Sequence, residues 1–297
     1  MNFADRLDAA TERVRTPALV GIDPHLDLLP DEYAAARDPR VPLAERAELV
    51  ERFCFELLDV VAGRVAAVKP QSAFFELLGS DGVRAFENVC ARARSLDLLV
   101  IGDVKRGDIA STASAYAESF LASGEHRCDA VTVSPYLGPD TLEPFANVCA
   151  REDGGMYVLL RTSNPGGGAF QLHGTPALWE EVAGALERLG TDLIGNSGFS
   201  SIGAVVGATH AAELATIRAR LPKTPFLLPG YGAQGAGADD VKPAFCDAES
   251  PWRGGLVNSS RGIAFAWRKD SASHPKDAAS KALDRMIADL AAALDIR

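Results

Sequence analysis

The stretch Leu98-Leu99-Val100-Ile101-Gly102-Asp103-Val104-Lys105 carries the pattern that decides the fold. It is an apolar run that turns charged at its carboxyl end, and a segment with helical spacing, 109–122, follows it. Continuous apolar runs are typical of parallel strands covered on both faces, whereas strands with one face in water alternate. The stretch therefore predicts a buried parallel strand with a polar end.

The same unit recurs along the whole chain. Strands are expected at 18–23, 65–70, 98–105, 130–135, 156–163, 202–209, 225–232 and 254–262, and helices at 44–62, 83–95, 109–122, 176–189, 211–221 and 276–293. No linker or shift in composition divides the 297 residues. Eight strand-then-helix units predict an α/β fold, a single (β/α)₈ TIM barrel that forms one domain over 1–297, rather than an open doubly wound sheet.

Polar residues gather at the carboxyl ends of these predicted strands. They are Asp23, Lys69, Asp103 with Lys105, Ser134, Arg161 with Ser163, Thr209, the loop at Gly230, and Asn258 with Arg261. In a barrel these ends converge on one face, where the loops build active sites. Polar groups with a purely structural role would be spread over both ends, so the bias predicts a functional mouth.

Composition narrows the function classes. The formal net charge of −10 and the pI near 5.0 argue against a nucleic-acid binder or a polybasic membrane-surface protein. No run approaches the ~18 apolar residues needed to span a bilayer, and the start of the chain lacks the apolar core of a signal peptide. Five widely spaced cysteines without a CxxC pair suit a reducing compartment. We expect a cytoplasmic protein without nucleic-acid or membrane partners.

Asp103 and Lys105 lie two apart on a strand, so both side chains should point to the same side. A lysine among carboxylates stays protonated, because negative charge favours its charged form, and it can donate a proton. A substrate carboxylate ~4 Å from Asp103 would be repelled by ~4 kcal/mol at an effective dielectric near 20. Losing CO₂ removes this repulsion while the lysine protonates the carbanion. The pair therefore predicts cofactor-free decarboxylation, and a structural ion pair is the alternative.

Three neighbours could extend the pair, each with a plainer interpretation. Lys69 is a second cation at the mouth, or a solvated strand end. Asp108 adds a carboxylate, or caps the helix that follows. Asp23 can accept hydrogen bonds from substrate hydroxyls, or form an Asx turn before Pro24.

The loops after the last two predicted strands are typical of a phosphate site, in which backbone N–H groups and a helix N-terminus bind the anion. Gly230 and Gly232 let the chain approach a phosphate, Gln234 can donate its amide, and Arg261 supplies a bidentate cation. The run 230–235 also matches the dinucleotide pattern GxGxxG. It belongs, however, to the seventh of eight similar units, which does not suit a doubly wound sheet.

The run Arg-Thr-Ser-Asn-Pro-Gly-Gly-Gly at 161–168 predicts a glycine-rich lid, with a plain flexible loop as the alternative. Ser163 could contact a heterocycle, although Thr162 and Asn164 are equally polar. The five histidines are isolated and show no HExxH spacing, so no metal site is predicted. No Ser-His-Asp arrangement stands out either.

The run 103–109, Asp-Val-Lys-Arg-Gly-Asp-Ile, resembles the DxKxxDI signature of orotidine 5′-phosphate decarboxylases. The runs 68–76 and 229–235 are similar to the longer bacterial branch of that family, and the resemblance covers all eight units. It implies a TIM-barrel homodimer that converts orotidine 5′-phosphate to UMP and CO₂, the last step of de novo UMP synthesis. No metal or organic cofactor is implied.

The resemblance also implies a role for each matching residue. Lys105 would donate a proton to the pyrimidine C6, and Asp103 would face the departing carboxylate. Lys69 and Asp108 would complete an alternating network, with Asp108 reaching into the partner subunit's site. The substrate-binding residues would be Asp23 for the ribose, Ser163 for the pyrimidine, and Gly230, Gly232, Gln234 and Arg261 for the phosphate.

Two rival functions remain. The 3-keto-L-gulonate 6-phosphate decarboxylases and hexulose-phosphate synthases share a similar DxKxxD, and they are similar in using Mg²⁺ with an acidic ligand at the end of strand two. This chain has Lys69 there, which would repel a cation. The other rival is a non-catalytic phosphate-binding barrel, which should have lost members of the charged network that are all present here.

Overall fold

The computed structural model describes residues 1–122, 124, 127–232, 235–245, 250–269 and 273–296. Eight parallel strands pair in chain order, and β8 pairs with β1 to close the barrel. The strands are β1 Ala18–Ile22, β2 Ala67–Pro70, β3 Leu99–Arg106, β4 Ala130–Val133, β5 Gly155–Arg161, β6 Ile202–Val206, β7 Phe226–Leu228 and β8 Gly255–Ser259. The predicted TIM barrel is confirmed.

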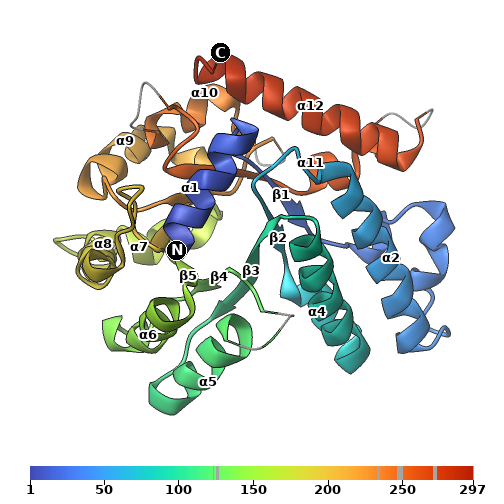
Figure 1. The fold of residues 1–297 in the computed structure, drawn as a ribbon, viewed down its shortest axis with the longest axis horizontal. Helices are drawn as coiled ribbons and strands as arrows, with labels where there is room; N and C mark the ends of the chain where they lie inside the picture. The colour runs from blue at the N-terminus through green and yellow to red at the C-terminus, as the bar shows by residue number, and fades with distance from the viewer. Residues whose placement is uncertain (123, 125–126, 233–234, 246–249, 270–272, 297) are drawn as a thin grey trace.

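Helices surround the barrel (Figure 1). They are α1 Phe3–Val14, α2 Leu43–Val61, α3 Ser72–Glu76, α4 Gly79–Ser95, α5 Ala110–Leu121, α6 Glu143–Glu152, α7 Gly168–Gln171, α8 Leu178–Gly190, α9 Ala211–Arg220, α10 Ala238–Val241, α11 Arg261–Ala264 and α12 Pro275–Ala293. The six predicted helices are present with shifted ends. The sequence reasoning missed α6, although Pro144 lies in its first turn, where a missing N–H costs no hydrogen bond.

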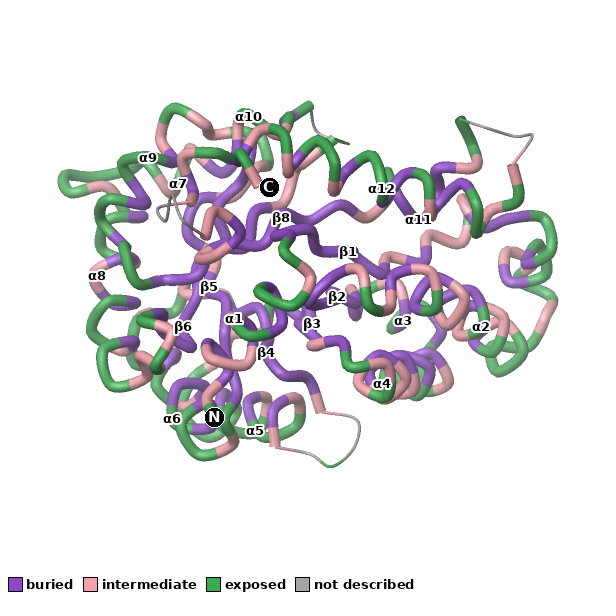
Figure 2. The backbone as a smooth tube through the Cα atoms, turned by 45° about the horizontal axis from the view of Figure 1, so that its top comes forward, coloured by how far each residue is buried: buried purple, intermediate pink, exposed green. Residues whose placement is uncertain are grey.

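The strands are buried on both faces, and the outer faces of the helices are exposed (Figure 2). Strand side chains that point outward pack against the helices in the larger hydrophobic core. Strand side chains that point inward fill the lower part of the barrel in a second core, which includes Leu19, Ile101, Tyr157 and Leu256. This double burial explains why the strands read as continuous apolar runs.

Helix α1 lies across the amino-terminal end of the barrel (Figure 1). The Phe3 ring packs edge-on against Tyr157, with ring centroids 6.1 Å apart. A Cβ atom at residue 155 would lie 2.2 Å from the Phe3 ring, so Gly155 makes this packing possible. Arg6 Nη1 binds Asp129 Oδ1 at 2.5 Å and joins the helix to the strands. With this end plugged, the interior of the barrel opens at the carboxyl ends of the strands.

Several strands end earlier than the sequence predicts. β7 stops at Leu228 and β6 at Val206, so Gly230, Gly232 and Thr209 lie on the segments that follow, and the predicted ends were wrong there. Gly230 has a φ of 103°, which lies outside the extended region and ends strand pairing. The helices in the described part of the chain include none with the length and hydropathy of a membrane-spanning segment.

Candidate active site

Three charged residues meet at the carboxyl ends of β2 and β3. Lys69 Nζ binds Asp103 Oδ2 at 2.5 Å, and Lys105 Nζ binds the other oxygen of the same carboxylate. The side chains of Lys69 and Asp103 are 6% and 8% exposed, whereas that of Lys105 is 46% exposed. Lys69 is therefore no solvated strand end, and the prediction that Asp103 and Lys105 share a side is confirmed.

A β-bulge, rather than regular alternation, brings Lys105 to this position. The β3–β4 register pairs Gly102 with Val131 and resumes only at Arg106 with Val133. Lys105 lies inside the bulge, with a φ of 44° in the left-handed region. Bulges near active sites re-aim side chains in this way. Period-two alternation predicted the correct side of the strand, although the bulge is what places Lys105 there.

Thr132 connects Asp103 and Lys105, and the sequence reasoning missed it in favour of Ser134. Its Oγ1 accepts the backbone N–H of Lys105 at 2.9 Å and donates to Asp103 Oδ1 at 3.0 Å. The available signal was a hydroxyl in the middle of the apolar strand 130–133, at an inward-facing position two residues after Ala130.

The trio is held in its charged form. Burial raises the pKa of Asp103, but the ammonium groups of Lys69 and Lys105 outweigh burial and hold that pKa well below its usual range. Burial lowers the pKa of Lys69, but the charges of Asp103 and Asp23 outweigh it and raise that pKa above 10.5. The structure thus keeps a buried carboxylate and a buried ammonium ionised side by side.

Asp23 follows β1 and lies close enough to influence Lys69. Its Oδ1 atom is buried and has no hydrogen-bond partner among the described residues. The Asx turn offered as its alternative is not seen, since the hydrogen bond in this turn is a backbone one, donated by His25 N to Asp23 O. An orphaned buried oxygen is costly unless a ligand or water donates to it.

The charged trio lies against a cavity of about 610 Å³. The remaining lining comes from Thr132, the apolar side chains Leu159, Val205, Leu227 and Pro229, and the loop after β5. Binding sites for small molecules commonly have this size and this mixture of apolar walls with few polar groups. Apolar walls also lower the local dielectric and strengthen the charge interactions on the floor.

The loop after β5 favours Ser163 over its polar neighbours as a ligand contact. Thr162 Oγ1 donates to Asn164 Oδ1 at 2.6 Å and accepts from Gln171 Nε2 at 2.7 Å, so both neighbours are already bonded within the loop. The Ser163 hydroxyl has no partner among the described residues, and Ser163 lines the cavity. A Cβ at residue 207 would lie 2.9 Å from Ser163, so Gly207 allows the loop to approach β6.

Arg161, a predicted polar group of the mouth, is the last residue of β5 and is buried. The β5–β6 register shifts between Leu159 and Arg161. The guanidinium binds Glu213 of α9, with Nε–Oε2 at 2.7 Å and Nη2–Oε1 at 3.1 Å. Arg161 therefore lies at the carboxyl end of its strand as predicted, but its guanidinium is paired within the protein and does not line the cavity.

The predicted phosphate loops meet at the ends of β7 and β8. Gly232 has a φ of 71°, and a Cβ there would meet open space. Arg261, the first residue of α11, is exposed. It lies near His25, whose pKa is lowered by burial and also by the Arg261 charge, against the opposing charge of Asp23. Gln234 lies outside the described residues.

A larger cavity of about 940 Å³ borders the same loops on the side of α12. Its lining includes Gly232, Ser259 and Gly262, together with Arg285 and Asp289 of α12. None of the charged trio lines it, so it is not where the proton chemistry would occur.

Asp108 lies in the loop after β3 and does not cap α5. Its Oδ1 accepts from Ile109 N at 2.7 Å, and Ile109 occupies the N-cap position without a side-chain cap. The capping interpretation was therefore wrong. Ile109 is 59% exposed, and Tyr136, on the neighbouring loop after β4, is 78% exposed.

Among the described residues, no cluster of three or more His, Cys, Asp or Glu side chains could hold a metal ion.

Comparisons with known proteins give matches along most of the chain. A family model described as orotidine 5′-phosphate decarboxylase / HUMPS family matches residues 21–274. The chain is similar to an orotidine 5′-phosphate decarboxylase of Rhodopirellula baltica, 43% identical over 288 residues and 93% of each chain. A Deinococcus radiodurans protein of the same name is 44% identical over 265 residues and 89% of each chain. The Leishmania donovani OMP decarboxylase structure matches with a TM-score of 0.74 and 32% identity, over 100% of each chain.

Proposed function

The chain belongs to the orotidine 5′-phosphate decarboxylase / HUMPS family, and on that premise we propose that it converts orotidine 5′-phosphate to UMP and CO₂. The observation that carries the proposal is the Lys69–Asp103–Lys105 trio on the floor of the apolar cavity. The relatives named for this reaction favour it over the Mg²⁺-dependent members of related families. The ammonium group of Lys69 also stands where those enzymes carry an acidic ligand.

Asp103 and Lys105 perform the chemistry. The ionised Asp103 carboxylate faces the substrate carboxylate and repels it by about 4 kcal/mol at ~4 Å and an effective dielectric near 20. Departure of CO₂ breaks the bond between C6 and the carboxyl carbon and leaves the electron pair on C6. The Lys105 ammonium, half-exposed toward the cavity, then donates its proton to C6. Lys69, buried and charged, holds Asp103 in place.

The remaining residues bind the nucleotide. Asp23 accepts a hydrogen bond from a ribose hydroxyl, a role supported by its orphaned buried oxygen. Ser163 contacts the pyrimidine, a role supported by its unpaired hydroxyl beside the cavity. Arg261 binds the phosphate together with the backbone at Gly230 and Gly232 and, on sequence grounds, the Gln234 amide.

A homodimer completes the site. Asp108 makes no ion pair with Lys105 of its own chain among the described residues, so it is available to another subunit. Ile109, Tyr136 and Leu137 present exposed apolar side chains on the same two loops. Exposed apolar side chains that gather next to a polar site are typical of a subunit interface. In a two-fold dimer, Asp108 of each chain would reach the charged trio of the other.

One assay tests the reaction. Purified protein treated with a chelator is mixed with orotidine 5′-phosphate, and the loss of the pyrimidine's ultraviolet absorbance is followed. Full turnover is expected, which separates this function from the metal-dependent relatives. Folded protein that binds UMP without turning over the substrate would favour the binding-module alternative.

A mixing experiment tests the shared site. Lys105→Ala and Asp108→Ala variants, each inactive as pure dimers, are exchanged to form hybrids. If Asp108 acts across the interface, each hybrid contains one intact site, and activity should recover to about a quarter of wild type. No recovery in hybrids that are shown to form would place both residues in the same chain's site.

A further inference from the structure

Thr132 lies between the two residues that carry the proposed chemistry. It belongs to β4, is 1% exposed and lines the cavity. Its single hydroxyl makes two bonds, to Lys105 N at 2.9 Å and to Asp103 Oδ1 at 3.0 Å. A backbone N–H can only donate, so the hydroxyl accepts from Lys105, and its one hydrogen goes to the carboxylate. Both bond directions therefore follow from the chemistry of the groups.

The bond to Lys105 compensates for the β-bulge. Residues 103–105 fall between the two paired positions of the β3–β4 ladder, at Gly102 and Arg106, so the ladder provides no strand partner for the N–H of Lys105. The left-handed backbone of Lys105, with φ of 44°, is unfavourable for a residue with a side chain. The Thr132 hydroxyl replaces the missing ladder bond and holds this conformation.

The bond to Asp103 fixes the rotation of its carboxylate. Oδ1 binds Thr132 and Lys105, and Oδ2 binds Lys69. The terminal torsion of an aspartate is soft, so a third donor decides which oxygen faces each ammonium group. Thr132 is thereby bonded both to the backbone of the proton donor and to the carboxylate that holds its Nζ.

We propose that Thr132 is a positioning residue, whose hydroxyl sets the place of the Lys105 ammonium relative to Asp103. The inference rests on the proposed decarboxylation, because it concerns the same site. It predicts that the hydroxyl matters for the chemical step and little for nucleotide binding, since the bonds that Thr132 makes are to Lys105 and Asp103.

Two variants separate the hydroxyl from the shape of the side chain. Thr132→Val keeps the branched shape and loses the hydroxyl, and kcat should fall about 10- to 100-fold, the value of a hydrogen bond to a charged group. Its KM and its dissociation constant for UMP should change less than about 3-fold. Thr132→Ser keeps the hydroxyl and should retain at least about a third of wild-type kcat.

Turnover is expressed per UMP-binding site, measured by titration of the same preparation. A merely structural role would reduce the number of sites and leave the turnover of each site unchanged. Thr11→Val is the matched control, because Thr11 Oγ1 is a buried hydroxyl that donates to Leu7 O at 3.1 Å at the opposite end of the barrel. Its turnover per site should equal that of wild type. If Thr132→Val does not fold, Thr132→Ser and Thr132→Ala make the same comparison.

The inference is overturned if Thr132→Val turns over at the wild-type rate per site, or if Thr132→Ser loses as much activity as Thr132→Val. An active wild type separates this failure from failure of the proposed function. Wild-type protein that binds UMP without decarboxylating the substrate would contradict both the proposed function and the role of Thr132.

Discussion

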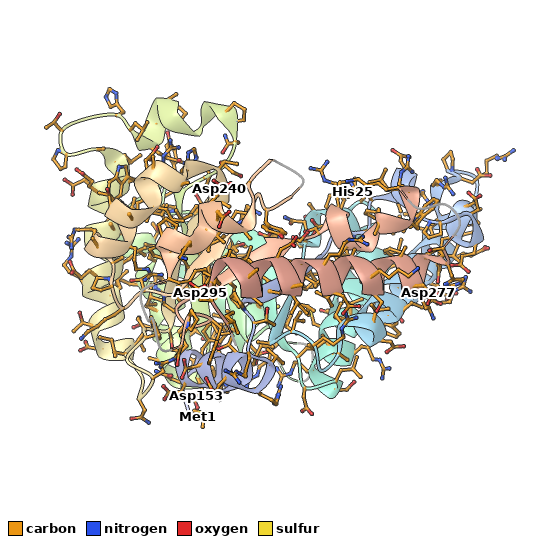
Figure 3. The ribbon with its side chains drawn as sticks, turned by 90° about the horizontal axis from the view of Figure 1, so that it is seen from above. Met1, His25, Asp153, Asp240, Asp277 and Asp295 are labelled. Atoms are coloured by element: carbon orange, nitrogen blue, oxygen red, sulfur yellow. The ribbon has the colours of Figure 1, made fainter. Side chains whose placement is uncertain are left out.

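The two ends of the barrel are built from the same strands but contain opposite chemistry. At the amino-terminal end, inward-facing Leu19, Ile101 and Tyr157 pack under Phe3 of α1. At the carboxyl end, the next inward positions on β2 and β3 carry Lys69 and Asp103. Figure 3 shows the separation: Met1 and Asp153 lie at the end near α1, and His25 lies on the opposite side.

The polar groups at the two ends also differ in what they bond. Near α1, charges are satisfied within the fold: Arg253 Nε binds Asp8 Oδ1 at 2.6 Å, and Trp252 Nε1 donates to Glu12 Oε2 at 2.8 Å. At the mouth, Asp23 Oδ1 is buried without a partner among the described residues. Tyr157 Oη and Arg6 Nε are also buried without a partner among these residues, but Phe3 of α1 packs over Tyr157. The Asp23 oxygen, in contrast, lies at the open end of the barrel, where a ligand can donate to it. Substitutions at the two ends should separate stability from turnover.

The largest expected effect is on turnover at the mouth. Lys105→Ala removes the proton donor, and kcat should fall at least about 10³-fold, within the range for loss of a general acid. Because Lys105 is half-exposed, folding should be nearly unaffected. Steady-state kinetics and UMP titration measure both quantities. Substantial activity in this variant would contradict the role given to Lys105.

The amino-terminal end should show the reverse behaviour. Phe3→Ala empties the centre of the plug beneath Tyr157, and the free energy of unfolding should fall by about 3–5 kcal/mol. Turnover per UMP-binding site should stay at the wild-type value. Urea denaturation measures the loss, and Leu43→Ala, an exposed position, is the control, with a change below about 0.5 kcal/mol. Reduced turnover per site in Phe3→Ala would show that the two ends are coupled.

The buried ion pair gives a pH-dependent test of the mouth. Asp103→Asn leaves the Lys69 ammonium without its main partner, and stability should fall by about 3 kcal/mol at neutral pH. Because the pKa of Asp103 is lowered by folding, its contribution is complete above the unfolded pKa near 3.8 and is lost as pH falls below that value. Because the pKa of Lys69 is raised by folding, its contribution is complete below 10.5 and is lost at higher pH.

The difference in unfolding free energy between wild type and Asp103→Asn should therefore be constant from about pH 5 to 9 and shrink in acid. Denaturation series across pH measure it. A difference that varies steeply around neutral pH would mean that another group titrates in the pair's environment.

The smallest expected effect concerns the loop after β5. Ser163→Ala removes the free hydroxyl, and KM should rise about 5- to 10-fold, the value of one neutral hydrogen bond, with little change in kcat. Asn164→Ala is the comparison, because its side chain bonds Thr162 within the loop. A larger rise in KM for Asn164→Ala than for Ser163→Ala would contradict this role of Ser163 and assign the pyrimidine contact to Asn164.

Much of the site could be found from the sequence because strand ends in a barrel converge by geometry. Lys69, Asp103 and Lys105 were placed together from period-two alternation and the common polarity of the strand ends, and their ion pairs agree. Thr132 was missed, and the ion pair of Arg161 with Glu213 was not predicted. Thr132 points inward by regular alternation from Ala130, so its hydroxyl was a readable signal. The irregular β3–β4 pairing opposite Thr132 and the β5–β6 register shift at Arg161 depend on pairs of strands and cannot be read from one strand's periodicity.

The sequence by itself determined the barrel. Eight apolar strands must be buried on both faces, and the helices that alternate with them along the chain cover their outer faces. The sequence also determined which charged residues lie at the mouth. The tertiary structure alone decided how the trio is held: which Asp103 oxygen meets each lysine, the left-handed backbone of Lys105, and the Thr132 hydroxyl that joins them. These depend on a bulge between β3 and β4, and the pairing of neighbouring strands is not encoded in the periodicity of either one.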